Sequence, residues 1–225
     1  RASSCYRSLG TRPGQEATKV MAGRRRLSRA ERRAQIIDVT LDSIARNGVR
    51  GTTLSSIAAT VGVTTPALYT HFKNRREILL AALDVLFEYR TLPHRYPAEG
   101  NALERLRAIG HRHTELLEGE NDRSVFALFE FIAAPPEEGL RETLGEKHLL
   151  LVEDIAEIVR QGQREGCIRK DADAYQTAWM IVSRAWTEDI THLMGVAGEW
   201  DPQRSNRMLE LILGSVAATP VDGDT

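Results

Sequence analysis

The sequence has few cysteines, no long apolar run and no alternating strand pattern, and each absence excludes a class of protein. Cys5 and Cys167 stand far apart and match no metal-ligand or redox spacing, which argues against a disulfide-stapled fold and for a reducing compartment. No apolar segment approaches the length of a membrane span. The 225 residues are 42% hydrophobic, enough to bury a core without cross-links. We therefore expect a cytoplasmic protein with no membrane partner.

The first part of the chain lacks periodicity. Residues 1–20 mix Ser, Gly, Pro and Arg and lack the unbroken apolar core of a secretion signal. We interpret residues 1–23 as a disordered or artefactual N-terminal extension and leave them out of the fold prediction.

Acidic and basic residues are unevenly divided along the chain. Residues 1–80 hold 15 Lys and Arg against 5 Asp and Glu, and the totals of 30 and 31 leave 15 against 26 for the remainder. The first part therefore carries a formal charge of +10 and the rest −11. A charged segment is usually only a solvated surface, but a basic front joined to an acidic body also fits a protein that binds a polyanion at one end. Motifs must decide between these interpretations.

Helix start and stop signals follow one another after residue 27. Ser28 and Glu31 have the form of a capping box, and apolar residues at helical spacing predict a helix over about residues 29–46 that stops at Asn47-Gly48. The next predicted helix begins at Thr52 or Thr53 and ends at Gly62.

A third and a fourth helix complete the pattern. Thr64 is positioned to cap the third, in which Pro66 is tolerated because first-turn amides have no intrahelical partner. Asn74 and Glu77 open a long fourth helix that we expect Pro93 to end. Two short helices across a glycine turn, flanked by two longer ones, predict a helix-turn-helix.

The outward residues of the third helix suit a DNA major groove. Thr65 and Ala67 are small enough to approach base edges, and Pro66 offers a rigid apolar contact. Tyr69 alone could be a packing residue and His71 an exposed helix end, but their combination in a basic segment favours groove binding. Side chains that can donate hydrogen bonds or charge to phosphates are Tyr69, His71, Lys73 and Arg75.

Three patterns in this region carry a family resemblance. They are TTLxxIA over residues 52–58, GVTxxxLY over 62–69 and HFKNRRE over 71–77. In order and spacing they resemble the DNA-binding segment of the TetR family of transcriptional regulators, over about residues 28–80.

The resemblance implies an all-α homodimer on a near-palindromic operator, by family default a repressor. It implies base contacts from Thr65, Pro66 and Ala67. An alanine at position 67 shifts the expectation towards apolar or shape readout, because many relatives carry glycine or a hydrogen-bonding residue there. The resemblance further implies that Tyr69, Thr70 and His71 line the groove and that Thr53 and Arg75 hold phosphate. We add Thr64 and Lys73 to the predicted DNA contacts.

Arg24, Arg25 and Arg26 stand just before the first predicted helix. They are either a disordered basic tail or an arm that reaches phosphate or the minor groove, and the sequence does not favour one interpretation.

Helical periodicity continues through the acidic body. We predict a DNA-binding domain over residues 24–75, a connecting helix over 76–95 and an effector-binding and dimerisation domain over 96–219. The segment VFALFEFIAA, residues 125–134, is apolar nearly all round and predicts a central helix. The last two helices carry apolar stripes that suit a dimer interface, with Trp186, Ile190, Leu209, Ile212 and Val216 as contact candidates.

Candidate effector residues come from the same body. His113 falls on an apolar helix face, where a satisfied core histidine is favoured over an effector contact. Glu130 is a lone acid in an apolar segment, and pairing with an arginine or reaching solvent is favoured over anchoring a ligand. The predicted small-molecule site comprises Tyr89, His113, Phe126, Phe129, Glu130, Trp179 and Met180.

No catalytic, cofactor or metal site is predicted. His111 and His113 are two residues apart and point to different helix faces, and no phosphate loop or nucleophile elbow occurs. Two rival hypotheses remain, an architectural DNA-binding protein without effector and, less favoured, an enzyme with an appended helix-turn-helix. The first predicts a body without a cavity, the second titratable groups converging in a cleft.

Overall fold

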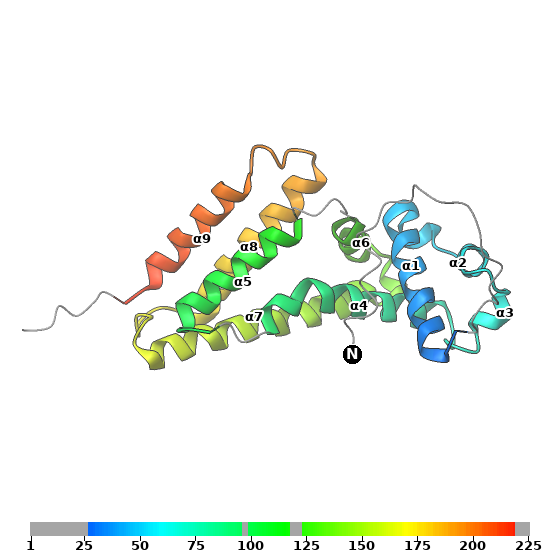
Figure 1. The fold of residues 1–225 in the computed structure, drawn as a ribbon, viewed down its shortest axis with the longest axis horizontal. Coiled ribbons are helices and arrows are strands. Elements are labelled where there is room, and N and C mark those ends of the chain that lie inside the picture. Colours follow the sequence, from blue (N-terminus) through cyan, green and yellow to red (C-terminus); the bar gives the residue numbers. More distant parts are fainter. Residues whose placement is uncertain (1–26, 96–98, 118–122, 219–225) are drawn as a thin grey trace, which may run out of the picture. The chain divides into compact units, whose positions relative to one another are not determined.

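The computed structural model describes residues 27–95, 99–117 and 123–218 (Figure 1). The predicted N-terminal extension and the Arg24–Arg26 arm lie outside these ranges. The described residues form α-helices joined by short loops, with a single isolated bridge between Ile168 and Ala217, which confirms the predicted all-α fold. The elements are α1 (Arg29–Gly51), α2 (Leu54–Val61), α3 (Thr65–Leu68), α4 (Arg75–Arg95), α5 (Ala102–Leu117), α6 (Arg123–Ile132), the 3-10 helix η3 (Pro136–Glu138), α7 (Leu140–Glu165), α8 (Ala174–Leu193) and α9 (Pro202–Val216).

The chain divides into two compact units. The first contains residues up to Tyr89 together with 120–144, and the second contains 90–119 with 145–225. The helix-turn-helix segment therefore shares a unit with α6 and η3, which the predicted boundaries had placed in the body. Both α4 and α7 contribute residues to each unit.

In the first unit α6 packs against α1, and α2 contacts both α1 and α3 (Figure 1). Its core is apolar, and the fully buried side chains include Ile36, Ile57, Leu68, Leu79 and Phe131. α6 is less central than predicted, because Phe126 on it is 44% exposed.

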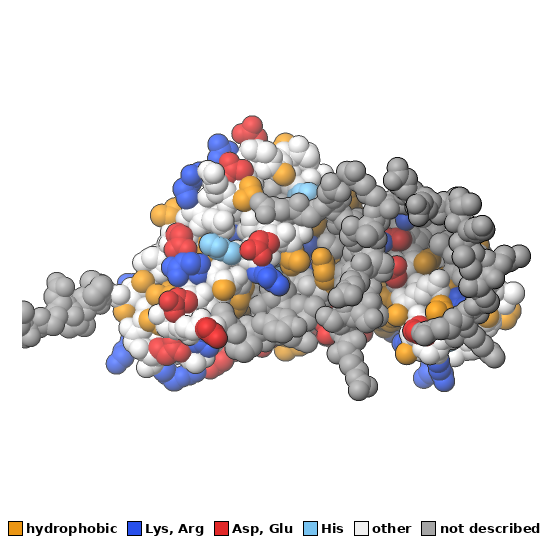
Figure 2. Space-filling view, viewed as in Figure 1, with side chains coloured by type: hydrophobic (Ala, Val, Ile, Leu, Met, Phe, Trp, Pro, Cys, Tyr) orange, Lys and Arg blue, Asp and Glu red, His pale blue; other side chains and the backbone are white. Residues whose placement is uncertain are grey.

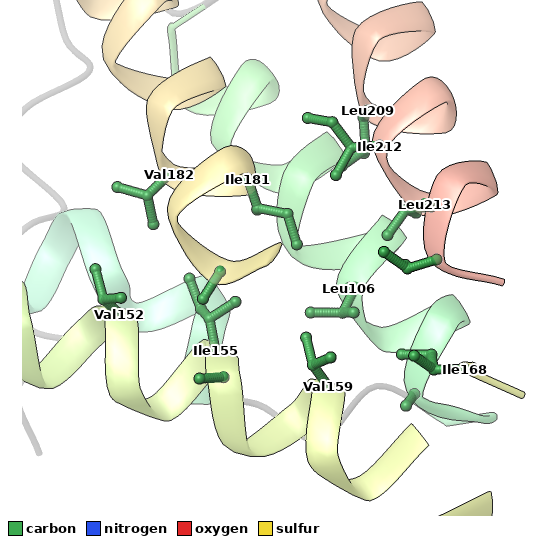
Figure 3. Close-up of a cluster of buried hydrophobic side chains, with 14 residues drawn as sticks. Leu106, Val152, Ile155, Val159, Ile168, Ile181, Val182, Leu209, Ile212 and Leu213 are labelled. Carbon is green, nitrogen blue, oxygen red and sulfur yellow. The ribbon is translucent and has the colours of Figure 1, made fainter. Parts of the chain in front are cut away.

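The second unit is a helical bundle of α5, most of α7, α8 and α9. Its core side chains point inward from all four helices (Figure 3). On the face of this unit seen in Figure 2, acidic and basic side chains are interspersed, as in the exposed pair Arg107–Glu210 at 2.6 Å. The labelled core residues of Figure 3 are Leu106, Val152, Ile155, Val159, Ile168, Ile181, Val182, Leu209, Ile212 and Leu213.

Several predicted helix ends are confirmed. Ser28 and Glu31 form the capping box of α1. The sequence also offers Asp171 or Asp173 as the start of one later helix and Asp201 as the start of the next, and in the structure Asp173 caps α8 and Asp201 caps α9. Gly62 ends α2 in the left-handed conformation with φ of 75°, which glycine adopts without the steric cost of a β-carbon.

Other ends differ from the prediction. Gly48 breaks the helical backbone with φ of 72° as expected, but one further turn carries α1 on to Gly51. α4 continues past Pro93 to Arg95, because a proline in the last turn removes one backbone hydrogen bond without ending the helix. None of the described helices is both long and apolar enough to cross a membrane.

Candidate nucleic-acid interface

The turn between α2 and α3 is built from local hydrogen bonds. Thr53 caps α2, where its hydroxyl accepts the backbone N–H of Ser56 at 3.2 Å. After Gly62 the N–H of Val63 bonds back to the carbonyl of Ala58 at 3.0 Å. Leu68 and Phe72 are 1% and 2% exposed. These buried contacts fix α3 against the rest of the unit and leave its other face outward.

α3 itself is shorter than predicted. It has one regular turn, Thr65–Leu68, and the chain continues in tight turns through Phe72, with hydrogen bonds such as His71 N–H to Leu68 carbonyl at 2.9 Å. Thr64 occupies the cap position, yet its side chain makes no capping hydrogen bond. The predicted helix start at Thr64 is therefore confirmed, without a hydrogen bond from its hydroxyl.

The structure brings most of the predicted DNA contacts to one short segment. Tyr69 is 52% exposed, and Thr70 is exposed with its hydroxyl donated to the Ala67 carbonyl at 2.8 Å. The half-buried members of the predicted set are Thr65, Ala67 and His71, and the exposed ones are Thr53, Thr64, Pro66, Tyr69, Thr70 and Lys73.

Arg75 makes its contacts inside the first unit. Its Nε donates to the Thr52 carbonyl at 2.8 Å, a terminal nitrogen donates to the Val49 carbonyl, and the other pairs with Glu138. The guanidinium thus joins the α1–α2 loop to η3 inside the first unit. These bonds use three of the five N–H donors of the guanidinium, so Arg75 has a role within the fold and its predicted phosphate contact stays a prediction.

Two further contacts hold the same unit together. The carboxylate of Glu130 on α6 accepts the backbone N–H of Val49 at 3.1 Å, directly after the Gly48 kink. Arg123 at the start of α6 pairs with Asp38 at 3.1 Å and with Asp42 on α1. Glu130 therefore satisfies a backbone donor, a role that neither of the two predicted alternatives had included.

A pocket of about 360 Å³ opens beside Glu130. It is lined by Glu130, residues 45–50 of α1 and residues 133–135 after α6. The other predicted effector residues of this unit, Tyr89, Phe126 and Phe129, do not line it.

Arginines of α1 contact the end of the α3 segment. Arg33 donates to the His71 carbonyl at 2.5 Å, lies 3.8 Å from the Phe72 ring centre and approaches Glu77 at 3.4 Å. Arg29 donates to the Thr70 carbonyl at 3.2 Å. Burial, and then the positive charges of these arginines and Arg32, lower the pKa of His71.

The second unit contains a buried polar network that includes His113. The His113 Nε2 atom lies 3.6 Å from Glu188 and 3.7 Å from Asp189. Asp189 pairs with Arg90 at 2.5 Å. Burial alone would raise the pKa of Asp189, but Arg90 and His113 outweigh it and hold that pKa below its usual range.

Arg184 is the centre of the other half of this network. Its guanidinium donates to Glu188 at 3.0 Å, to Ser205 at 2.5 Å and to the Gly110 carbonyl at 2.8 Å. Sequence reasoning missed Arg184, Glu188 and Asp189. The sequence feature that could have identified them is that these three charged residues interrupt the apolar stripe of α8.

A half-buried aromatic cluster lies on α7 and α8. The His148 ring centre lies 5.5 Å from that of Trp179 and 5.4 Å from that of Trp186. The indole N–H of Trp186 donates to His148 Nε2 at 3.3 Å. Burial lowers the pKa of His148.

The predicted effector residues fall into the two units. Tyr89, Phe126, Phe129 and Glu130 belong to the first, and His113, Trp179 and Met180 to the second. The proposal that they share one ligand site stays a prediction.

The predicted dimer contacts divide between surface and core. Leu209, Ile212 and Val216 are at most 7% exposed and pack in the core of their own unit, and their part in a dimer contact stays a prediction. Trp186 is half-buried and Ile190 is 42% exposed. Exposed apolar residues that the prediction missed nearby are Met194, Met208 and Leu211.

The described residues include no group of three or more His, Cys, Asp or Glu positioned to hold a metal ion. Over the residues that the structure describes, an all-helical fold with a compact helix-turn-helix and an outward face of small and hydrogen-bonding side chains is typical of helix-turn-helix regulators.

Comparison with known proteins agrees with this class. Residues 36–82 match the family model "Bacterial regulatory proteins, tetR family". The regulator TtgR of Pseudomonas putida is 47% identical over 58 residues, 26% of this chain and 28% of TtgR. That match thus spans little more than a quarter of TtgR.

Longer matches extend the likeness. The fatty acid metabolism regulator protein of Bacillus subtilis is 25% identical over 189 residues, 81% of this chain and 94% of that protein. The structure of the transcriptional regulator FadR of Bacillus subtilis with stearoyl-CoA has a TM-score of 0.65 at 25% identity, over 81% of this chain and 98% of FadR. AibR, solved with isovaleryl coenzyme A and operator DNA, shares the fold with a TM-score of 0.58 at 21% identity, over 83% and 98% of the two chains. The chain therefore resembles the TetR family of regulators in its helix-turn-helix segment and shares an overall fold with FadR and AibR.

Proposed function

We propose that this protein is a cytoplasmic transcriptional repressor that binds a near-palindromic DNA operator as a homodimer and is released by a small-molecule effector. The observation that carries the proposal is the outward face of residues 64–73, where small side chains and hydrogen-bond donors lie together. A groove-binding segment needs both, small groups against base edges and donors for the flanking phosphates.

The relatives supply a first effector class to test. FadR was solved with stearoyl-CoA and AibR with isovaleryl coenzyme A and operator DNA. Acyl-coenzyme A thioesters are therefore the compounds that we propose to screen first. Regulation requires that such a ligand bind one conformation of the dimer better than the other.

The contacts within the first unit suggest how a change in α6 reaches the DNA-binding segment. Glu130 holds the N–H of Val49, and Glu138 holds Arg75, which in turn binds the Thr52 carbonyl just before α2. A shift of α6 or η3 would either break these hydrogen bonds or move the residues that they join. We propose that this set of contacts sets the position of α2 and α3.

The test begins with selection of duplexes from fragmented genomic DNA by the purified full chain. Fluorescence anisotropy then measures affinity for a selected duplex and for its scrambled control at two salt concentrations. We expect tight, sequence-dependent binding that acyl-coenzyme A weakens.

Weak, strongly salt-dependent binding without sequence preference would contradict the repressor and favour the architectural alternative. A ligand that binds the protein and leaves operator affinity unchanged would contradict induction by that ligand.

A further inference from the structure

A basic cluster surrounds the end of the predicted recognition segment, and the function proposed above does not account for all of it. Arg29, Arg32 and Arg33 occupy the first turns of α1, and all three lower the pKa of His71 through their charge. Four groups that can carry positive charge thus meet at the point where the α3 segment turns back towards α4.

The three arginines are not equivalent. Arg33 is committed to the fold, because it bonds the His71 carbonyl, covers the Phe72 ring and pairs with Glu77. Arg29 makes one hydrogen bond, to the Thr70 carbonyl, and Arg32 bonds the neutral amide of Gln35 at 2.8 Å. A guanidinium has five N–H donors, so these bonds leave most of the donors of Arg29 and Arg32 for another acceptor.

The acidic groups around the cluster are already engaged. Glu31 accepts the backbone N–H of Ser28 at 2.7 Å in the capping box. Glu77 accepts the Lys73 backbone N–H at 2.6 Å and also faces Arg33. The nearby cation Lys73 is exposed. The cluster therefore keeps an excess of positive charge, which an arriving anion would relieve.

The hydrogen bonding of the His71 side chain is incomplete. Its ring is half-buried and its Nδ1 atom is buried without a hydrogen-bond partner. An imidazole in such a place is held neutral by its surroundings, and a phosphate oxygen nearby would favour the charged form instead.

We infer that Arg29 and Arg32 of α1, with His71 of the recognition segment, form a binding site for DNA backbone phosphate, and that filling this site protonates His71. The inference deepens the proposed function, on which it rests. It adds two phosphate-binding residues from outside the helix-turn-helix, and a dependence of DNA affinity on pH.

The direction in which DNA affinity changes with pH follows from the lowered pKa of His71. In the DNA-free protein the pKa of His71 lies below 6.5, so the ring is neutral near neutral pH. Phosphate raises that pKa, and the DNA complex binds more protons than its free components. Affinity therefore increases as pH falls, by less than tenfold per pH unit for each protomer, because each protomer takes up at most one proton.

The first experiment measures binding of a selected duplex, and of a mixed-sequence duplex, against salt concentration. The double variant R29Q/R32Q is expected to lower the slope of log K against log salt by about 0.9 for each phosphate that the variant no longer neutralises. The control R112Q/R169Q removes the same charge from two exposed positions in the second unit and is expected to keep the slope. Equal slopes for wild type and R29Q/R32Q would overturn the site.

The second experiment follows the ring protons of His71 by NMR, assigned by their loss in H71Q. The pKa of His71 is expected to rise when the mixed-sequence duplex is added, and DNA affinity to lose most of its pH dependence in H71Q. If the pKa of His71 stays unchanged on DNA binding, protonation is not coupled to the phosphate site.

Failure of the inference and failure of the proposed function give different results. Sequence-specific binding with unchanged salt and pH slopes in the variants would leave the repressor standing and remove the phosphate site. Binding to mixed-sequence DNA that responds to R29Q/R32Q, without any preferred sequence, would leave the phosphate site standing and remove the repressor.

Discussion

Arg75 shows at the residue scale how a basic side chain close to the predicted DNA contacts can also be engaged within the fold. Its three hydrogen bonds, to Thr52, Val49 and Glu138, fix the chain just before α2. Lys73, two positions earlier, is exposed, and only its backbone N–H bonds to Glu77. The two cations therefore have different consequences when they are removed.

R75Q is expected to destabilise the protein by about 1–3 kcal/mol, because buried carbonyls lose a charged donor. Thermal unfolding measures the loss. K73Q is expected to leave the unfolding temperature unchanged and to lower the salt slope of DNA binding by about 0.9. A variant R75Q that keeps its unfolding temperature but lowers that slope would identify Arg75 as a phosphate contact.

His148 gives a second prediction at this scale, on stability against pH. Burial lowers its pKa below 6.5, so the folded state favours the neutral ring. The stability that this contributes is present above pH 6.5 and is lost as pH falls through the lower folded value. We expect the free energy of unfolding to decrease on acidification below pH 6.5, with a smaller decrease in H148Q.

Denaturant titrations at several pH values measure this difference. Because the pKa of His71 is also lowered, the comparison is made in an H71Q background. A pH profile that is the same with and without His148 would contradict the prediction.

At the scale of elements, the α2–α3 turn depends on one backbone conformation. Gly62 has φ of 75°, and an added β-carbon would meet no atom within 4 Å. G62A is therefore expected to cost about 1–2 kcal/mol through backbone strain alone. Gly145 in α7 is also open to a β-carbon but lies in a helix, where alanine is favoured by about 0.5–1 kcal/mol.

Chemical denaturation of G62A and G145A measures both effects, which are expected to have opposite signs. Destabilisation by both variants would mean that steric crowding, absent from this structure, controls the two positions.

The pairing of α6 with α1 gives an element-scale prediction about regulation. E130A removes the acceptor for the Val49 N–H and is expected to weaken the response of operator affinity to effector more than operator affinity itself. E137Q, at an exposed neighbouring acid in η3, is the control. Fluorescence anisotropy with and without ligand compares the two variants. If operator affinity in E130A responds to the effector as in the wild type, Glu130 is excluded from the contacts that connect α6 with α2 and α3.

For the whole molecule, the proposed homodimer requires an exposed apolar surface. Ile190 on α8 and Met208 and Leu211 on α9 are 42%, 40% and 71% exposed, and we propose that they contribute to the homodimer contact. Carboxylates at such positions would be buried unpaired in that contact, at a high desolvation cost.

M208E/L211E is expected to shift the protein from dimer to monomer in sedimentation velocity. The exposed pair Leu149 and Leu150 on α7 provides the comparison variant L149E/L150E, which is expected to leave the dimer intact. The reverse result would place the interface on α7.

The sequence determined those features that depend on neighbouring residues. Capping at Ser28, Asp173 and Asp201 and the left-handed turn at Gly62 were predictable, because each requires a particular side chain at one local position. Helical periodicity and motif spacing likewise predicted the all-α class, which the structure confirms. The outward groups of residues 64–73 could be predicted in the same way, because two buried side chains, Leu68 and Phe72, fix the orientation of a short segment.

Only the tertiary structure decided which distant residues meet. Arg75 meets a glutamate 63 residues away, and Glu130 meets a backbone N–H 81 residues away, so the role of neither follows from its local sequence. The apolar stripe of the ninth helix predicted burial correctly, but whether its own chain or a second copy covers Leu209 depends on how the helices pack. Helical spacing reports the face that a residue occupies, and the partner on that face is selected by the packing of the whole chain.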